Sequence, residues 1–373
     1  MTESTALKHG LDGKAVGHLA AQLHAADPSF DTKGFIRTAT RGLTALELKQ
    51  RVHHVIVALR RFLPPDIPKA LVLLRHVAAK WERFPGTLGG FAAWPIIDFV
   101  GEHGLSHFDD SMNALRDLTC LFSAEFAIRP FLSADPPKAL RHLRRWVKDD
   151  REHVRRLVSE GTRPRLPWGM RLRCFDDDPT PILELLTRLR DDPSEYVRRS
   201  VANHLNDIAK QDPPRVVELC EQWLPGASDE RRALIRHALR TLVKAGDPGA
   251  LRALGFDPDV PVSVEGLRVT PKTLRFPGDL ALSFTLRSKA KRPVDLVVDY
   301  TLHRTTTRGM AGKVFKLRTV TLGPGEALTI DKVHRLRPIS TRTYHSGPHA
   351  IEVMVNGRAR AKTGFSMTVP ASD

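Results

Sequence analysis

The hydrophobic period of the sequence changes near residue 258, and this change limits the possible folds more than any other feature. Up to about residue 257, apolar residues recur at intervals of three and four, the spacing that lines one face of an α-helix. Beyond Pro258 they alternate with small or polar residues, which is the period of a half-buried strand. Pro258 and Pro261 bracket the change. We predict a helical domain over residues 1–257 and a β-domain over residues 258–373.

The helical part contains an internal repeat. Asp-Pro dipeptides return at intervals of 43, 34 and 35 residues, beginning at Asp135, Asp178, Asp212 and Asp247. Asp at an N-cap followed by Pro starts a helix, because the Asp oxygen accepts from unpaired amides and Pro lacks one. His-Val-Arg-Arg at 153–156 also returns as Tyr-Val-Arg-Arg at 196–199. These intervals predict two-helix units stacked in a HEAT-like α-helical solenoid. An irregular all-helical domain is the alternative.

Three alternating runs carry the prediction for the C-terminal part. Their apolar members are Leu280, Leu282, Phe284 and Leu286, then Val294, Leu296, Val298 and Tyr300, then Ile351, Val353 and Val355. Asn356-Gly357 follows the last run and favours a type I′ hairpin turn, because both residues tolerate positive φ. Short strands at this spacing predict a small immunoglobulin-like β-sandwich. No cysteine lies beyond Cys220, so a disulfide between its sheets is excluded.

The charge of the chain points to a polyanionic partner. The 58 basic residues exceed the 42 acidic ones by 16, and 41 of the basic residues are arginine. Guanidinium groups neutralise phosphates and release counterions, so nucleic acid is the first candidate. Residues 259–373 hold 19 basic and 9 acidic residues. This domain either makes a second phosphate contact or has a well-solvated basic surface.

The sequence also limits the compartment and the chemistry. No apolar run approaches 18 residues and the N-terminus has no apolar core, so we expect a cytoplasmic protein without a membrane span. The three cysteines, Cys120, Cys174 and Cys220, lie too far apart for a zinc motif or a disulfide framework. We expect neither a metal site nor a cofactor.

The segment Ser159–Gly169 is the most unusual local sequence. Its two prolines and two glycines predict a rigid loop between helices, holding Glu160, Arg163, Arg165 and Trp168. Loops on a stiff scaffold often carry function. Each residue also has a structural alternative: Glu160 can cap a helix or pair with arginine, and Trp168 can fill a gap between repeats.

Two further carboxylates lie in helical patterns. Over residues 196–210, the apolar residues fall on one helix face and a polar set falls on the other, with Asp207 at its rim; the polar set is Arg199, Asn203, Asn206 and Lys210. Such donors suit phosphate and sugar contacts. Glu125 is predicted in a helix with Leu115, Leu118, Phe122 and Phe126, at the edge of their apolar stripe. Ion pairs, with Arg129 in the case of Glu125, are the structural alternatives.

These motifs resemble the bacterial AlkC-type DNA alkylation repair glycosylases. The resemblance rests on LELKQRV at 46–52, AAWPIIDFVGEHG at 92–104, SEGTRPRLPWG at 159–169 and VRRSVANHLNDIAK at 197–210, and on the β-domain. It implies a HEAT-like-repeat, monofunctional glycosylase that removes cationic bases such as 3-methyladenine and 3-methylcytosine. By motif, Glu125, Glu160, Trp168 and Asp207 would line the lesion pocket. The DNA contacts would come from Arg163, Arg165, Arg198, Arg199 and Asn203, with Asn206 and Lys210 on the same polar face.

The chemistry of such a lesion fits these residue types. A base alkylated at N3 is cationic and leaves as a neutral molecule, so a strong general acid is not needed. The sugar becomes oxocarbenium-like, and a nearby carboxylate stabilises it. A second carboxylate can activate the attacking water, and Trp168 can stack on the cationic base.

Other readings of the sequence remain open. A non-catalytic HEAT-repeat scaffold for damaged DNA would use the same basic face, and a helical adaptor would bind an acidic protein instead. For the glycosylase we expect double-stranded DNA with alkylated bases as the partner, action as a monomer, and association with the nucleoid through DNA.

Overall fold

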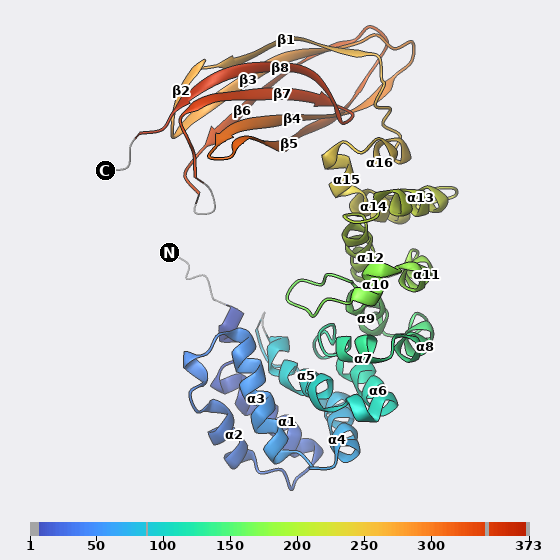
Figure 1. Cartoon of the computed structure of the whole chain (residues 1–373). Helices are drawn as coiled ribbons and strands as arrows, with labels where there is room; N and C mark the ends of the chain where they lie inside the picture. The colour runs from blue at the N-terminus through green and yellow to red at the C-terminus, as the bar shows by residue number, and fades with distance from the viewer. Residues whose placement is uncertain (1–6, 87–88, 340–342, 371–373) are drawn as a thin grey trace. The chain divides into compact units, whose positions relative to one another are not determined.

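The computed structural model describes residues 7–86, 89–339 and 343–370. Helices occupy the chain before residue 254 and strands the chain after residue 261 (Figure 1). The α-helices are α1 Gly13–Ala26, α2 Thr32–Thr40, α3 Leu48–Phe62, α4 Ile67–Lys80, α5 Trp94–His103, α6 Phe108–Leu118, α7 Arg129–Ala134, α8 Pro136–Trp146, α9 Glu152–Gly161, α10 Arg173–Asp177, α11 Thr180–Leu189, α12 Glu195–Ile208, α13 Pro213–Trp223, α14 Asp229–Ala238, α15 Arg240–Ala245 and α16 Pro248–Ala253. Short 3-10 helices are η1 Leu7–Gly10, η2 Leu43–Ala45, η3 Gly89–Ala92 and η4 Leu105–His107.

The strands form two sheets. They are β1 Val262–Thr270, β2 Thr273–Arg275, β3 Gly278–Ser288, β4 Val294–Thr306, β5 Gly309–Leu322, β6 Ala327–Leu336, β7 Gly347–Val355 and β8 Arg358–Thr368. One sheet has the order β1-β3-β6 and the other the order β2-β8-β7-β4-β5. All pairs are antiparallel except β2 with β8. The predicted change from helix to strand is therefore confirmed.

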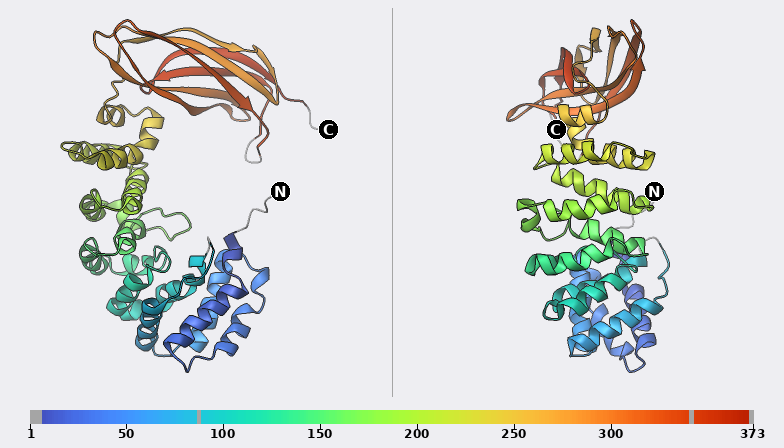
Figure 2. Two further views of the ribbon diagram at one scale, coloured as in Figure 1. Left: turned by 180° about the vertical axis from the view of Figure 1, so that it is seen from behind. Right: turned by 90° about the vertical axis from the view of Figure 1, so that its right-hand side faces the viewer.

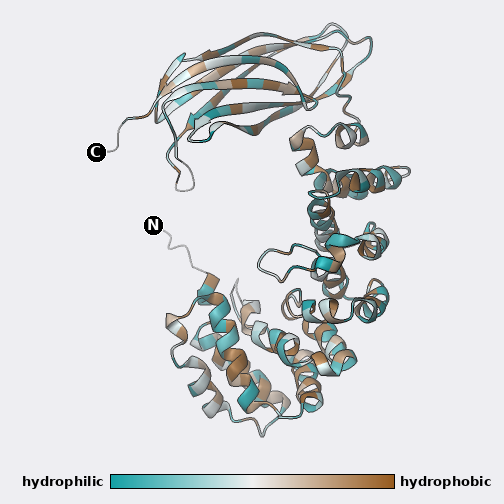
Figure 3. Cartoon of the chain, in the orientation of Figure 1, coloured by the Kyte–Doolittle hydropathy of each residue, from teal (hydrophilic) through white to brown (hydrophobic). Residues whose placement is uncertain are grey.

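Alternation along the strands builds the core of the β-sandwich. The residues predicted to face inward on the three runs are buried, except Val294, which is partly buried. Figure 3 shows hydrophobic and hydrophilic residues interspersed along the strands. Asn356 and Gly357 have φ of 48° and 75° at the turn between β7 and β8, as a type I′ turn requires.

The chain divides into two compact units that differ from the predicted domains. One holds residues up to 208 together with 229–234, and the other holds 209–228 and 235–373. Within the second unit, the backbones of Gly246 and Gly357 touch: a Cβ on Gly246 would lie 2.8 Å from the Gly357 carbonyl oxygen. Close backbone packing therefore joins α15 to the β7–β8 turn. The boundary at 257/258 marks the change of secondary structure, and as a domain boundary it stays a proposal.

Three of the four Asp-Pro steps of the predicted repeat start helices as predicted. Asp135, Asp212 and Asp247 are N-caps whose side chains accept from the backbone amides of Lys138, Arg215 and Ala250. Asp178 differs, because α11 begins only at Thr180 and Asp178 accepts from the Thr180 amide at 2.9 Å. At these four positions the dipeptide thus precedes a helix, even where the cap is displaced by a residue, whereas Asp27-Pro28 and Asp257-Pro258 lie in turns.

Helix pairs stack in the first unit as a HEAT-like repeat. The pair α8–α9 precedes the pair α11–α12, with α9 against α12 and α8 against α11. Figure 2 shows these helices as successive layers. The predicted apolar side of α12, Val197, Val201, Leu205 and Ile208, is buried. In the described part of the chain, no helix is long and apolar enough to cross a membrane.

Candidate active site

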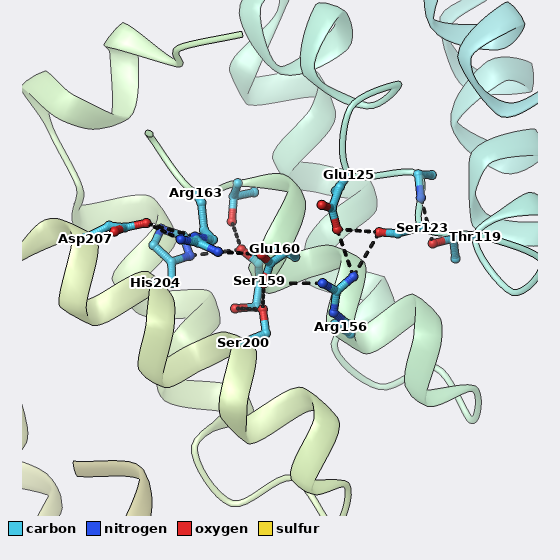
Figure 4. Close-up of polar contacts among 12 residues, drawn as sticks. Thr119, Ser123, Glu125, Arg156, Ser159, Glu160, Arg163, Ser200, His204 and Asp207 are labelled. Atoms are coloured by element: carbon cyan, nitrogen blue, oxygen red, sulfur yellow. Dashed lines mark hydrogen bonds and ion pairs between the residues drawn. The ribbon is translucent and has the colours of Figure 1, made fainter. Parts of the chain in front are cut away.

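The three predicted carboxylates and two arginines form one continuous series of ion pairs (Figure 4). Arg156 Nη1 lies 2.9 Å from Glu125 Oε2, and Arg156 Nη2 lies 3.7 Å from Glu160 Oε2. Arg163 Nη1 donates to Glu160 Oε1 at 2.5 Å, and Arg163 Nη2 donates to Asp207 Oδ2 at 2.6 Å. We call these five residues the carboxylate network. Its three carboxylates outnumber its two guanidiniums, so the network is anionic within a strongly basic protein.

Helix ends bring Glu160 and Asp207 together. Glu160 lies in the last turn of α9 and Asp207 in the last turn of α12, and these two helices pack against each other. The prediction that residues 159–169 form a loop throughout is wrong for Ser159–Gly161, which continue α9. Gly161 is the last residue of α9, and a Cβ there would lie 2.8 Å from Ile128 Cγ2, so this position has no room for a side chain.

Glu125 lies in a turn between α6 and α7, and its predicted place in a helix is wrong. Helix α6 ends at Leu118, and the Ala124 amide donates to Thr119 Oγ1 at 3.2 Å within the turn. Phe122 and Phe126 have helical spacing in the sequence, but both rings contact Trp94 of α5 instead, Phe126 by stacking at 5.6 Å. Aromatic packing of a turn therefore imitates the apolar stripe of a helix.

Burial and charge act against each other in the network. Burial alone would raise the pKa of Glu160, but Arg156 and Arg163 together hold that pKa below its ordinary value of 4.5. Burial also disfavours the charged guanidiniums of Arg156 and Arg163, yet the carboxylates raise the pKa of both. Glu160 therefore remains ionised at neutral pH in a site where its side chain is only 7% exposed.

Two neutral side chains, Ser200 and His204, complete the surroundings of Glu160. Ser200 donates to Glu160 Oε2 at 2.6 Å. His204 Nδ1 lies 2.9 Å from the Ser159 carbonyl oxygen. Since that oxygen only accepts, Nδ1 carries the hydrogen, and Nε2 is a buried atom without a partner among the described residues. Burial lowers the pKa of His204 to about 3, so this ring is neutral beside the network.

A buried arginine fixes the loop that follows α9. Arg129, predicted as a partner of Glu125, is fully buried and donates instead to the backbone carbonyls of Met170, Gly161 and Pro164. That pairing is therefore wrong, because Arg156 binds Glu125 while the loop uses the donors of Arg129. The segment 162–172 is thus clamped from inside the protein.

Trp168 projects from this loop into solvent. It is 63% exposed, and its backbone has φ of 64°, a left-handed conformation that is strained for a bulky residue. Lys49 Nζ of α3 donates to the Trp168 carbonyl oxygen at 2.6 Å. The alternative in which Trp168 fills a gap between repeats does not hold.

The residues predicted to bind DNA have varied surroundings. Arg199 is exposed and pairs with Glu195 at 2.6 Å. Arg165 is half-exposed, 3.4 Å from Asp176. Arg198 donates to the carbonyls of Asp192 and Pro193. Lys210 is exposed and Asn203 half-buried.

Of two further members of that set, Arg163 is mostly buried and Asn206 is buried. Arg163 belongs to the carboxylate network, with a side chain 11% exposed. Asn206 is 4% exposed, and its Oδ1 has no partner among the described residues. The uniform polar face predicted for residues 196–210 is therefore wrong at Asn206. Helix α12 packs against both α9 and α11, so less of its surface is open than a two-faced pattern implies.

Sequence reasoning missed several residues that build the site. Arg156 stands in the repeated Val-Arg-Arg phrase, and its distance of four residues from Glu160 was a usable signal. Lys49 stands in the LELKQRV motif, but nothing in the sequence links it to a tryptophan 119 residues away. Among the described residues, no group of three or more His, Cys, Asp or Glu is placed to hold a metal ion.

Comparison with known proteins gives consistent matches. The family model described as DNA alkylation repair enzyme matches residues 117–242, and the model for the C-terminal Ig-like domain of the uncharacterised protein YhaZ matches residues 263–369. The uncharacterized protein YhaZ of Bacillus subtilis is 33% identical over 363 residues, covering 97% of this chain and 99% of that protein. The structure of Pseudomonas fluorescens alkylpurine DNA glycosylase AlkC, bound to DNA containing an abasic site analog, is 39% identical with a TM-score of 0.87, covering 97% of this chain and 99% of that chain. This chain therefore belongs to the AlkC family of DNA alkylation repair enzymes, with a HEAT-like helical region and an Ig-like C-terminal domain.

Proposed function

We propose that this protein is a monofunctional DNA glycosylase that excises cationic N3-alkylated bases, such as 3-methyladenine and 3-methylcytosine, from double-stranded DNA. The observation that carries the proposal is the carboxylate network: three acidic side chains gathered by two arginines in a protein of net charge +16. The relative from Pseudomonas fluorescens, named as an alkylpurine DNA glycosylase, supports the same class of reaction.

The charge of the network matches the charge that the reaction develops. An N3-alkylated base already carries a positive charge, so cleavage moves that charge onto the sugar as the base leaves. Fixed carboxylates stabilise the oxocarbenium-like sugar more strongly than water does, because they need no reorganisation. The two arginines lower the pKa of Glu160 and hold the three carboxylates together. A neutral base lacks this electrostatic assistance, which favours damaged bases over normal ones.

The hydrogen bonds to Glu160 and Glu125 distinguish the roles of these two carboxylates. Both oxygens of Glu160 are engaged, one by Arg163 and one by Ser200. Glu125 accepts from Ser123 and Arg156 on Oε2 alone, and no described residue donates to its Oε1. We assign to Glu125 the direct contact with the sugar or the attacking water. Glu160 and Asp207 act as the fixed negative charge behind it.

Trp168 and the basic surface account for recognition. The exposed indole can stack on a cationic base, an attraction of about 0.5–2 kcal/mol. Arg199 and Lys210 are exposed members of the predicted DNA-binding set and suit phosphate contacts. Arg165, Arg198 and Asn203 stay in that set as candidates, while Arg163 acts through the carboxylates. The basic Ig-like domain supplies a further phosphate contact. Action as a monomer in the cytoplasm, near the nucleoid, belongs to the same proposal.

A base-release assay tests this function. Duplex DNA treated with a methylating agent is incubated with the protein, and released 3-methyladenine and 3-methylcytosine are measured beside an undamaged control. Glu125→Gln, Glu160→Gln and Asp207→Asn remove one charge each with little change of shape. We expect the rate to fall about 10²–10³-fold for Glu125→Gln, comparable to the loss of a transition-state-stabilising group. Damage-dependent binding without base release by the wild type would favour the non-catalytic scaffold.

A further inference from the structure

Lys49 connects two parts of the first unit that are distant in sequence. It stands in the first turn of α3, and its ammonium donates to the backbone carbonyl of Trp168 at 2.6 Å. The same ammonium lies 5.2 Å from the centre of the Phe126 ring, a cation–π contact. Phe126 directly follows Glu125 in the chain. One side chain therefore contacts both the Trp168 loop and the turn that carries Glu125.

Groups that attract a positive charge lie around the Lys49 ammonium. Phe126 stacks on Trp94, whose Nε1 donates to Asp98 Oδ2 at 2.7 Å. Asp98 Oδ1 is buried without a partner among the described residues. Burial raises the pKa of Asp98 to about 7, while the Trp94 hydrogen bond and the positive charge of Lys49 act against the rise. An aromatic face and a carboxyl group thus attract the same ammonium.

Lys49 gives the Trp168 loop a second contact, in addition to the buried Arg129. Arg129 clamps the loop by three backbone carbonyls and leaves the indole exposed. Trp168 itself has a left-handed backbone, a conformation that persists only where the surroundings hold it. The Lys49 bond falls on the carbonyl of that strained residue. It therefore fixes the peptide plane from which the indole projects.

We propose that Lys49 is a positioning residue, which holds the Trp168 indole in register with Glu125 by binding the Trp168 carbonyl across the loop. The proposal rests on the glycosylase function proposed above as far as the indole meets a damaged base. The Lys49 ammonium is directed to the backbone oxygen and the Phe126 ring, so we assign it no contact with the base. Its effect passes through Trp168.

Kinetics test this role by separating chemistry from binding. Lys49→Ala, Lys49→Arg and Lys49→Met are compared with Lys33→Ala, which removes the same charge from an exposed position on α2. We expect Lys49→Ala to slow single-turnover base release about tenfold at saturating DNA, since small misplacements of reacting groups are costly. DNA affinity should change no more than in Lys33→Ala, and Lys49→Arg should recover part of the rate.

A double-mutant cycle identifies the route of the effect. In a Trp168→Ala background, Lys49→Ala should slow the reaction no further, because the side chain that Lys49 positions is gone. An undiminished tenfold effect in that background would overturn the proposal and indicate a direct phosphate contact. A loss confined to DNA affinity, or a rate equal to that of Lys33→Ala, would also overturn it.

A spectroscopic measurement keeps the test independent of activity. The protein has five tryptophans, so the difference in emission between a protein and its Trp168→Phe form isolates one indole. We expect Lys49→Met to change the acrylamide quenching of that difference signal, while Lys33→Ala leaves it unaltered. An unchanged signal would refute the tether. A changed signal without any base release by the wild type would preserve the tether and refute the proposed function.

Discussion

Helices α9 and α12 carry the same Val-Arg-Arg sequence 43 residues apart. Only the first arginine makes equivalent hydrogen bonds to the backbone in both helices. Arg155 donates to the carbonyls of Asp149 and Asp150, and Arg198 donates to those of Asp192 and Pro193. Each guanidinium therefore closes the turn that precedes its own helix. This role depends on the local repeat, so it is conserved between the two copies.

The second arginines differ because their neighbours differ. Arg156 is 17% exposed and binds Glu125 from the turn between α6 and α7. Arg199 is 62% exposed, and among the described residues its ion pair is with Glu195 of the same helix. The same residue at the same place in a repeat thus belongs to the network in one copy and to the surface in the other. Substitutions in α9 and α12 can test this difference directly.

The largest expected effect comes from the second arginines. Arg156→Met should lower the free energy of unfolding by about 3 kcal/mol, because it removes the cation of the half-buried Glu125 and one of the two cations beside the buried Glu160. Arg199→Met should leave that free energy nearly unchanged, since its ion pair is exposed. Urea denaturation of both variants measures the contrast. Similar losses in the two proteins would mean that the repeats do not differ as described.

The first arginines should show a smaller contrast. Arg155 also pairs with the buried Asp192 at 2.6 Å, whereas Arg198 is held by backbone carbonyls. We expect a loss of about 2–3 kcal/mol for Arg155→Met and about 1–2 kcal/mol for Arg198→Met. Thermal or chemical unfolding provides the values. If Arg198→Met were silent, its turn-closing role would have to be abandoned.

The dependence of stability on pH should show the effect of His204 in α12. At the matching position of α9 the residue is Gly161. The pKa of His204 falls from 6.5 to about 3 on burial, so below pH 6.5 the unfolded chain binds a proton that the folded protein rejects. The contribution of His204 to the free energy of unfolding should therefore fall with decreasing pH, by up to about 1.4 kcal/mol per unit, while Asp98, whose pKa is raised to about 7, contributes the opposite slope over the same range. The lowered pKa of Glu160 acts in the same direction as that of His204, and its contribution is lost below about pH 4.5.

Denaturation between pH 7 and pH 5 compares the wild type with His204→Asn. The variant keeps a hydrogen-bond donor for the Ser159 carbonyl but does not titrate. Its stability should depend less on pH over this range. Parallel pH profiles would show that His204 does not cause the pH dependence.

The smallest effect concerns DNA binding by Arg199. Removing one phosphate contact should reduce the slope of log affinity against log salt by about one and weaken binding by less than tenfold. Fluorescence anisotropy of Arg199→Ala at several salt concentrations measures both quantities. Glu195→Gln serves as the matched control, since it releases Arg199 from its ion pair without removing the cation. An unchanged salt slope in Arg199→Ala would remove this residue from the DNA-binding set.

Local patterns in the sequence predicted the architecture well. The spacing of apolar residues distinguished helices from strands, and the Asp-Pro steps located three helix starts. The motifs also pointed to Glu125, Glu160 and Asp207, which the fold brings into one network. The same spacing misled at Phe122 and Phe126, because aromatic stacking on Trp94 satisfies the apolar residues of a turn.

The sequence by itself determined the two kinds of secondary structure, the two-helix repeat and the identity of the acidic residues, because each depends on periods of a few residues and on side-chain type. Only the tertiary structure decided which guanidinium serves which carboxylate. Arg129 turned to the backbone of the loop, Arg156 took its place at Glu125, and Lys49 reached Trp168 from α3. Such pairings depend on which helix ends meet in space and on how deeply they are buried, and no local spacing encodes either.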